Sequence, residues 1–331
     1  MVIGRLREQW NDRGEPLQRD LASQSDFGMQ IEHDTEGRGT AAGRATDDDR
    51  SILSRHREDR VQGVLAGELC LSPMSVDEGA RIYAKHRPRY PQALVDDLRE
   101  RTIGAQGERL IDWGCGTGEL TLRLSPYFDR VLAVDMGAEG IALGEEKARR
   151  EGADNVEWRL DRAENVEIER EGCDLITSAS AFHWMDRELL SRRAFQGLKI
   201  GGSLALLGGA GGNVWKGAQD WHRVAVECLR DYVGEWGQRP GQRENRPKED
   251  PEDILASAGF KIERFQYPTE FSWPVDEMAG YMYSITGPLP WILGERRADF
   301  ERDFSEALTR AFPQGEVHQT INFFLLIANK A

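Results

Sequence analysis

The chain has 331 residues, of which 39% are hydrophobic and 30% charged, and its formal net charge at pH 7 is −14. This length suits one large α/β domain with insertions or two domains. The acidic balance argues against a surface that binds nucleic acid, because such a surface needs clustered lysine and arginine. No apolar run approaches the roughly 20 residues of a membrane span, so we expect neither a nucleic-acid partner nor a membrane partner.

The four cysteines are scattered along the chain, and no two of them form a C-x-x-C pair. This usage is typical of reduced thiols inside the cell and not of a disulfide framework or a zinc site. The six histidines also lack the spacing of metal ligands. Because the start of the chain has no signal-peptide core, we expect a cytoplasmic protein without a metal ion.

Residues 1–72 are mostly charged or small, with Trp10 and Phe27 as the only aromatic residues. Such a segment buries too little apolar surface to offset the entropy that is lost on ordering. We expect it to be largely disordered, with short helices as the alternative. Met74 lies directly before the globular pattern, which leaves open a translation start there, and residues 73–331 are expected to form the folded domain.

Residues 74–102 predict two helices separated by a proline-marked break. The break contains the motif Tyr-x-x-x-Arg-Pro-x-Tyr-Pro, in which the first tyrosine is Tyr83 and the arginine is Arg87. This wording resembles the segment that folds over the cofactor in small-molecule methyltransferases. The resemblance implies that Tyr83 and Arg87 face the methionine end of the cofactor. A surface helical hairpin with an arginine lying along it is the alternative.

Residues 108–118, with the sequence ERLIDWGCGTG, combine a short apolar strand, a carboxylate and three glycines at every second position. We expect the strand at Arg109–Trp113 and a helix at Glu119–Phe128. Glycines leave the backbone bare where the strand becomes the helix, so a nucleotide-type ligand can lie against the chain. A glycine-rich turn without a ligand is the alternative. A dinucleotide fingerprint would place its third glycine three residues after the second, where this chain has Glu119.

The G-x-G-x-G form after an acidic strand end resembles motif I of the class I S-adenosylmethionine-dependent methyltransferases. The resemblance implies that S-adenosylmethionine is the cofactor and that it lies against Asp112, Gly114, Cys115 and Gly116. It also implies the fold of that class, a doubly wound α/β sheet of seven mostly parallel strands whose last strand runs antiparallel.

A second apolar strand, Val131–Val134, ends at Asp135 and Met136. An acidic residue about 20 positions after the glycine loop, at the tip of the next parallel strand, can accept two hydrogen bonds from ribose hydroxyls. We therefore predict that Asp135 binds the ribose and that Met136 borders the cofactor. The alternative is an aspartate that caps the helix that follows.

A helix at Gly140–Glu151 and a strand at Val156–Leu160 lead to the turn DRAE at 161–164. This turn resembles the adenine-binding turn of the same family, which is often G-D-A-E or G-R-A-E. The chain departs from that pattern, because Arg162 stands where a carboxylate for the adenine amino group is common. The resemblance implies that the backbone N–H of Ala163 donates to the adenine ring, on which Arg162 can stack.

A fourth strand at Asp174–Ser178 is followed by ASAFHWMD at 179–186. Ligands of open α/β sheets bind outside the carboxyl ends of the strands at the topological switch point, here between strands one and four. The wording A-F-H-W-x-D is close to that of the methyltransferase 11 group, which includes the trans-aconitate methyltransferase-like enzymes. The resemblance implies that Ser180 contacts the cofactor and that His183 lies beside the methyl group. There His183 is either a general base, which the ordinary pKa of histidine suits, or a neutral residue that orients the acceptor.

The remainder of the chain predicts the other half of the sheet. A helix at Arg187–Leu198 precedes a strand at Leu204–Leu207, and a helix at Pro251–Ala258 feeds a strand at Phe260–Tyr267. The last strand, Thr320–Ala328, is a nearly continuous apolar run, as in a strand that is buried on both faces. The family pattern would insert it between the fifth strand and the sixth.

Two insertions, at about 211–250 and 275–315, show helical periodicity with many aromatic residues. They interrupt the sheet near its carboxyl edge, so we expect them to form a helical cap over the acceptor site. Aromatic residues at helical spacing usually form a core, and this alternative stands beside a ligand pocket lined by a few of them. We expect the charged segment Arg239–Asp250 to be a mobile loop.

These motifs together predict an S-adenosylmethionine-dependent methyltransferase that transfers a methyl group to oxygen, nitrogen or carbon of a small molecule. A carboxylic acid, as the trans-aconitate-like wording implies, or a secondary metabolite is the expected acceptor. One alternative is a protein that binds S-adenosylmethionine without transferring its methyl group. The other is a nicotinamide-dependent oxidoreductase, which the glycine spacing opposes.

Overall fold

The computed structural model describes residues 73–209, 214, 219–233, 250–287 and 289–331. The predictions for residues 1–72 and for nearly all of the charged loop at 239–250 therefore lie outside the described residues. No helix within the described ranges is long and apolar enough to cross a membrane.

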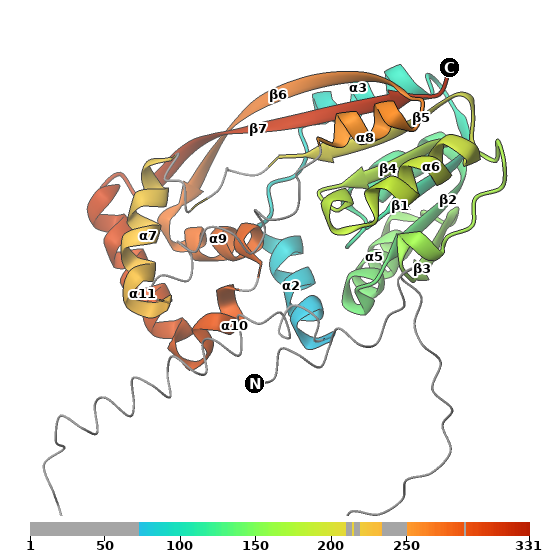
Figure 1. Cartoon of the computed structure of the whole chain (residues 1–331). Helices are drawn as coiled ribbons and strands as arrows, with labels where there is room; N and C mark the ends of the chain where they lie inside the picture. The colour runs from blue at the N-terminus through green and yellow to red at the C-terminus, as the bar shows by residue number, and fades with distance from the viewer. Residues whose placement is uncertain (1–72, 210–213, 215–218, 234–249, 288) are drawn as a thin grey trace, which may run out of the picture. The chain divides into compact units, whose positions relative to one another are not determined.

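Seven strands of the described chain form one sheet, in the order β3-β2-β1-β4-β5-β7-β6. Strands β1 to β5 pair in parallel, and β7 runs antiparallel to both of its neighbours, β5 and β6. This arrangement (Figure 1) confirms the predicted doubly wound α/β class with its inserted antiparallel strand. The strands are β1 (Gly107–Trp113), β2 (Phe128–Asp135), β3 (Val156–Leu160), β4 (Cys173–Ala179), β5 (Leu198–Gly208), β6 (Lys261–Pro274) and β7 (Glu316–Asn329).

Helices cover both faces of this sheet because alternate residues of each buried strand point to opposite sides. Leu110 of β1 packs in one apolar cluster with α3 and α4, whereas its neighbour Ile111 packs in a second cluster with α6 and α8. On the first side Leu94 and Leu98, one helical turn apart, are fully buried. The helices of this part are α2 (Pro73–His86), α3 (Gln92–Thr102), α4 (Glu119–Leu124), α5 (Ala138–Glu151), α6 (Arg187–Gly197) and α8 (Pro251–Ser257).

The helix after the glycine loop is shorter than predicted. Helix α4 ends at Leu124, a single 3₁₀ turn covers Ser125–Tyr127, and Phe128 already belongs to β2. Pro126 has no backbone N–H to continue the helical hydrogen bonds. The side-chain amide of Asn155 donates to the carbonyls of Ser125 and Phe128, both at 2.8 Å, and so satisfies the backbone where the helix stops.

Strands β6 and β7 continue beyond the sheet as a two-stranded ribbon. β5 pairs only with residues 324–329 of β7, so residues 316–323 of β7 pair with β6 alone. Only residues 325–328 form a run buried on both faces, and from Glu316 to Phe323 exposed and buried residues alternate. The predicted strand was therefore too short, and it was right about two-sided burial for its second half only.

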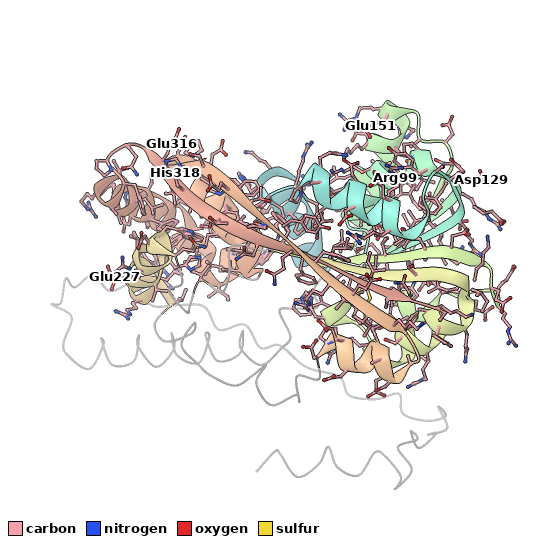
Figure 2. The ribbon with its side chains drawn as sticks, turned by 90° about the horizontal axis from the view of Figure 1, so that it is seen from above. Arg99, Asp129, Glu151, Glu227, Glu316 and His318 are labelled. Atoms are coloured by element: carbon pink, nitrogen blue, oxygen red, sulfur yellow. The ribbon has the colours of Figure 1, made fainter. Side chains whose placement is uncertain are left out.

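The ribbon carries a group of helices, which we call the cap (Figure 1). Both insertions contain helices, as predicted, and the described part of the second contains three α-helices. Figure 2 shows Glu316 and His318 of the ribbon and Glu227 of the cap on one side, with Arg99 and Asp129 on the other. The cap helices are α7 (Asp220–Val233), α9 (Met278–Thr286), α10 (Leu289–Leu293) and α11 (Arg297–Ala311).

Aromatic side chains form the core of the cap. The indole of Trp273 stacks on the ring of Tyr281 with centroids 4.5 Å apart, and Trp221 packs against the same tyrosine at 5.6 Å. Tyr281, Trp221, Phe300 and Phe304 are fully buried. These four aromatic residues therefore form a core, which is the alternative stated for the insertions, and Trp215 and Trp236 lie outside the described residues.

Helix α2 joins the cap to the sheet. It packs on α5 on one side and on α9 on the other (Figure 1). Arg81 of α2 pairs with Glu139 of α5 at 2.5 Å. At the end of α2 the guanidinium of Arg87 donates to the carbonyl of Ser284 in α9 at 2.9 Å.

Candidate active site

The three glycines of the loop between β1 and α4 serve different purposes. A Cβ on Gly114 would lie 2.4 Å from that of Ala181, and a Cβ on Gly118 would lie 2.3 Å from the indole of Trp158. These two positions are glycine because other segments pack against them. No atom of the described residues lies within 4 Å of a Cβ placed on Gly116, whose φ is +54°. Of the three glycines of this loop, Gly116 alone therefore presents a bare, left-handed backbone to open space.

Asp112 at the end of β1 is buried directly before this loop and anchors it through hydrogen bonds. Its side chain is 1% exposed and accepts hydrogen bonds from the hydroxyls of Thr121 at 2.6 Å and Thr177 at 2.8 Å. Burial raises the pKa of Asp112 to about 6, against the effect of these two bonds. The carboxyl thus ties β1 to α4 and β4, and its predicted contact with the cofactor stays a prediction.

Asp135 at the end of β2 faces the same loop. Its carboxylate accepts the backbone N–H of Gly116 and that of Gly137, both at 2.8 Å. Burial raises its pKa, whereas the N–H groups of Gly137, Gly116 and Met136 act in the opposite direction. The N-cap position of α5 is Gly137, so Asp135 is not the capping residue of that helix. Each carboxylate oxygen can accept a further hydrogen bond, which leaves capacity for two ribose hydroxyls.

Apolar side chains are exposed next to Asp135, at the carboxyl ends of β2 and β3. Met136 is 60% exposed and Leu160, the last residue of β3, is 57% exposed. In the following turn Ala163 is buried and begins a 3₁₀ turn, Ala163–Asn165. Arg162 is exposed, with its guanidinium 3.5 Å from the carboxylate of Glu164. The apolar surface suits a planar ring such as adenine.

The end of β4 carries a backbone outlier. Ser180 has a φ of +55°, one of two such values among the described residues that are not glycine. Its hydroxyl lies 2.9 Å from that of Tyr90, in the segment between α2 and α3, and its N–H donates to the carbonyl of Leu207 at 2.8 Å. A serine in the left-handed region costs about 1–3 kcal/mol and persists only where the surroundings hold it, which here are Tyr90 and β5.

His183 follows within a 3₁₀ turn, Phe182–Trp184. Phe182 is buried and anchors the turn, whereas His183 and Trp184 are exposed, with their rings 5.0 Å apart. The turn follows the carboxyl end of β4, directly after Ser180. The imidazole is therefore accessible at the carboxyl edge of the sheet, where the glycine loop also lies, and its predicted place beside the methyl group stays a prediction.

Tyr83 and Arg87 lie together at the end of α2. The Arg87 guanidinium is 5.2 Å from the centre of the Tyr83 ring, and both residues line a cavity that also contains Thr117 of the glycine loop. The predicted pair is thus adjacent to the loop. Cys115 is buried, and burial raises the pKa of its thiol well above the ordinary value, so its contribution to a site would come from its backbone.

The residues present fit S-adenosylmethionine. Because β2 and β4 are the two neighbours of β1, Asp135 and Ser180 lie on either side of the open position at Gly116. The site offers a hydrogen-bond acceptor for a ribose, apolar surface for an adenine and a bare backbone between them. Within the described ranges no group of three or more His, Cys, Asp or Glu side chains could hold a metal ion.

Comparisons with known proteins lead to the same class. Residues 110–202 match a family model described as a methyltransferase domain. The probable S-adenosylmethionine-dependent methyltransferase CRG1 of Saccharomyces cerevisiae is 30% identical over 125 residues, which are 37% of this chain and 43% of that protein. A malonyl-[acyl-carrier protein] O-methyltransferase of Bacillus cereus is 31% identical over 125 residues, 37% of this chain and 45% of the relative.

Residues 110–202 of this chain are thus similar to a methyltransferase domain, and the relatives support a class I S-adenosylmethionine-dependent methyltransferase. The chain matches less than half of the length of either relative. A putative type II methyltransferase from Anaeromyxobacter dehalogenans aligns with 74% of this chain and 97% of its own, at 21% identity and a TM-score of 0.49. The trans-aconitate-like subgroup of the methyltransferases stays a prediction.

Two residues at the candidate site had no role assigned from the sequence. Tyr90 belongs to the wording before motif I, but its bond to Ser180 joins residues 90 positions apart. Trp158 of β3 fills the space beside Gly118 and Gly144, where a Cβ would come within 2.4 Å of its ring. The sequence does contain a tryptophan in a predicted strand and a glycine at positions 118 and 144. Sequence periodicity does not show that these three residues contact one another, so their packing was not predicted.

Proposed function

We propose that this chain transfers a methyl group from S-adenosylmethionine to a small-molecule acceptor. The observation that carries the proposal is the position of Asp135 and Ser180, at the ends of the two strands beside β1, on either side of the open backbone at Gly116. A ligand held between these points lies at the switch point of the sheet, where α/β enzymes bind their substrates.

The cofactor-binding roles follow from position. Asp135 would accept the two ribose hydroxyls, and the apolar side chains of Met136 and Leu160 would border the adenine. The backbone N–H of Ala163 would donate to the ring, and Arg162 would lie over it. These contacts would fix the adenosine half and leave the methionine half to the glycine loop.

The methionine half would lie against Gly114, Cys115 and Gly116 and extend toward Tyr83 and Arg87. Arg87 is held by its bond to Ser284, so it would present its remaining N–H donors to a carboxylate without further ordering. Asp112 would keep the glycine loop in place through its hydrogen bonds with Thr121 and Thr177.

When bound, S-adenosylmethionine would supply a methyl group on a sulfonium: an acceptor lone pair would bond to the methyl carbon in line with the C–S bond, which would break to release S-adenosylhomocysteine. The chain contributes mainly by aligning the acceptor with the methyl group. A hydroxyl or a carbon acid also needs a base, which adds about 10²–10⁴-fold in rate. His183, exposed at the end of β4, would accept that proton at a ring nitrogen. For a carboxylate or a neutral amine it would only orient the acceptor.

The experiment is an acceptor screen that measures S-adenosylhomocysteine release by the full chain, beginning with carboxylic acids and then hydroxyl, amine and carbon acceptors. We expect turnover with one class. His183→Gln should lower turnover on a hydroxyl or carbon acceptor and spare cofactor affinity, whereas His318→Gln, on the exposed ribbon, should change neither. Cofactor binding without release of S-adenosylhomocysteine from any acceptor would favour a non-catalytic binding protein instead.

A further inference from the structure

A cavity of about 390 Å³ lies beside the glycine loop, between the end of α2, the start of α4 and the outer turns of α5. Thr117 and Tyr90 border it on the side of the site described above. Its charged lining consists of Arg87, Arg89, Lys147, Arg150, Glu119 and Glu151.

Two of the cations in this cavity are available. Neither Arg89 nor Lys147 makes a hydrogen bond or an ion pair with any residue that the structure describes. Arg150 approaches Glu146 at 3.9 Å, and both side chains are more than half exposed, so this pair contributes little. Arg87 is held by Ser284.

The two carboxylates of the lining offset only part of the charge of its four cations. Glu119 pairs at 3.1 Å with Arg123, which is not part of the lining. Glu151, labelled in Figure 2, is exposed at the end of α5 and makes no ion pair with the described residues. Positive charge is therefore in excess here, in a chain whose net charge is −14.

The available cations also converge. Burial raises the pKa of Glu119, and the charges of Arg123, Lys147 and Arg89 act together in the opposite direction. Lys147 of α5 and Arg89 of the segment before α3 thus approach the same carboxylate from different elements. Cations held close together repel one another, and a bound anion removes that repulsion and gains charge-assisted hydrogen bonds. Thr117 adds a hydroxyl donor at the inner wall.

We propose that this cavity binds a small oxyanion with two or more negative charges, of the phosphate or polycarboxylate class. The guanidinium of Arg89 would bind two oxygens at once, and Lys147 would act as a point charge. The site goes beyond the proposed function, because no methyl transfer is needed for the anion to bind. Tyr83, Arg87 and Thr117 of the proposed cofactor site line the same cavity, so the anion is expected at Arg89 and Lys147 while the cofactor product is bound.

The test is calorimetry of the full chain with pyrophosphate and with citrate, at about 50 mM salt, where charge screening is weak. We expect one site per chain for at least one of these anions. Arg89→Ala and Lys147→Ala should each weaken binding about tenfold. Arg149→Ala removes the same charge from an exposed position of α5 outside the cavity and should leave binding unchanged.

The choice between the two anions distinguishes phosphate from carboxylate chemistry, and either preference supports the proposal. Absence of binding for both would overturn it. An equal loss in Arg149→Ala and Lys147→Ala would also overturn it, because the attraction would then be diffuse. A third titration is made with S-adenosylhomocysteine present. Loss of anion binding there would assign these cations to the methionine carboxylate and overturn a separate anion site.

Discussion

The hydroxyl oxygens of Tyr90 and Ser180 lie 2.9 Å apart and connect the segment before α3 to the end of β4. Tyr90 is 7% exposed, and its ring packs edge-on against Phe323 of β7 at 5.7 Å. Ser180 has a left-handed backbone at the switch point of the sheet. The bond therefore couples the backbone geometry of the candidate site to the segment that covers it.

Tyr90→Phe and Ser180→Ala each remove one partner of this bond. A buried hydrogen bond contributes about 1 kcal/mol to the free energy of unfolding, so the double-mutant cycle should show a coupling energy of about 1 kcal/mol in urea denaturation. Contacting residues are coupled whereas independent ones are additive. Additivity of the two substitutions would show that the bond does not form in solution.

Asp135→Ala should weaken the binding of S-adenosylmethionine by about 10- to 150-fold, because hydrogen bonds to a charged group contribute about 1.5–3 kcal/mol. The measurement is calorimetry on a variant whose circular dichroism matches that of the native chain. Asp129→Ala serves as the control, since Asp129 lies near the opposite end of the same strand. Equal affinities for Asp135→Ala and the native chain would remove Asp135 from the ribose site.

Asp112 should make the domain less stable as the pH rises from about 4 to about 6. Burial raises the folded-state pKa from 3.8 to about 6. Below pH 3.8 both states hold the proton and there is no cost. Between the two values the unfolded chain ionises first, so the free energy of unfolding falls by up to about 3 kcal/mol and then stays level.

The test is Asp112→Asn, which keeps the shape of the side chain and leaves the hydroxyls of Thr121 and Thr177 with partners. Its stability relative to the native chain should rise by up to about 3 kcal/mol between pH 4 and pH 7. Denaturant unfolding at several pH values measures this difference. A difference that does not vary with pH would mean that the carboxyl is not buried in the way described.

Gly144→Ala should destabilise the domain although alanine favours helices. A Cβ at position 144 of α5 would lie 2.4 Å from the ring of Trp158, and such overpacking costs about 1–3 kcal/mol. Gly79→Ala in α2 is the matched control, because its nearest contact would be an ordinary 3.6 Å. The higher helix propensity of alanine, about 1 kcal/mol, should therefore make Gly79→Ala more stable than the native chain. Thermal unfolding that ranks the two variants in the reverse order would contradict the packing of Trp158.

The sheet order could be predicted because motifs and strands follow one another in a family pattern, and each core strand has its own apolar run. The ribbon could not be predicted with the same certainty. The run from Thr320 to Ala328 is nearly continuously apolar, but its neighbours change at Phe324, where β5 ends. Burial on one face or on both depends on those neighbours and not on the run itself.

Some features of the candidate site could likewise be predicted from the sequence, and others could not. Asp135 was predicted from its distance to the glycine loop, because both lie in consecutive units of the same βαβ motif. The left-handed backbone of Ser180 and the packing of Trp158 on Gly118 depend on partners that are distant in sequence. Local propensity carries no information about such contacts. The sequence pattern singled out the glycines of the loop as a binding site, whereas in the structure two of the three, Gly114 and Gly118, have other side chains packed against them.

The most direct test of the central claim is calorimetry of the purified chain against S-adenosylmethionine, S-adenosylhomocysteine and NAD. The arrangement of Gly116, Asp135 and Ser180 predicts micromolar binding of the first two and no binding of NAD. Binding of NAD alone would contradict the account, and the residue roles proposed for the glycine loop, Asp135 and His183 would have to be withdrawn.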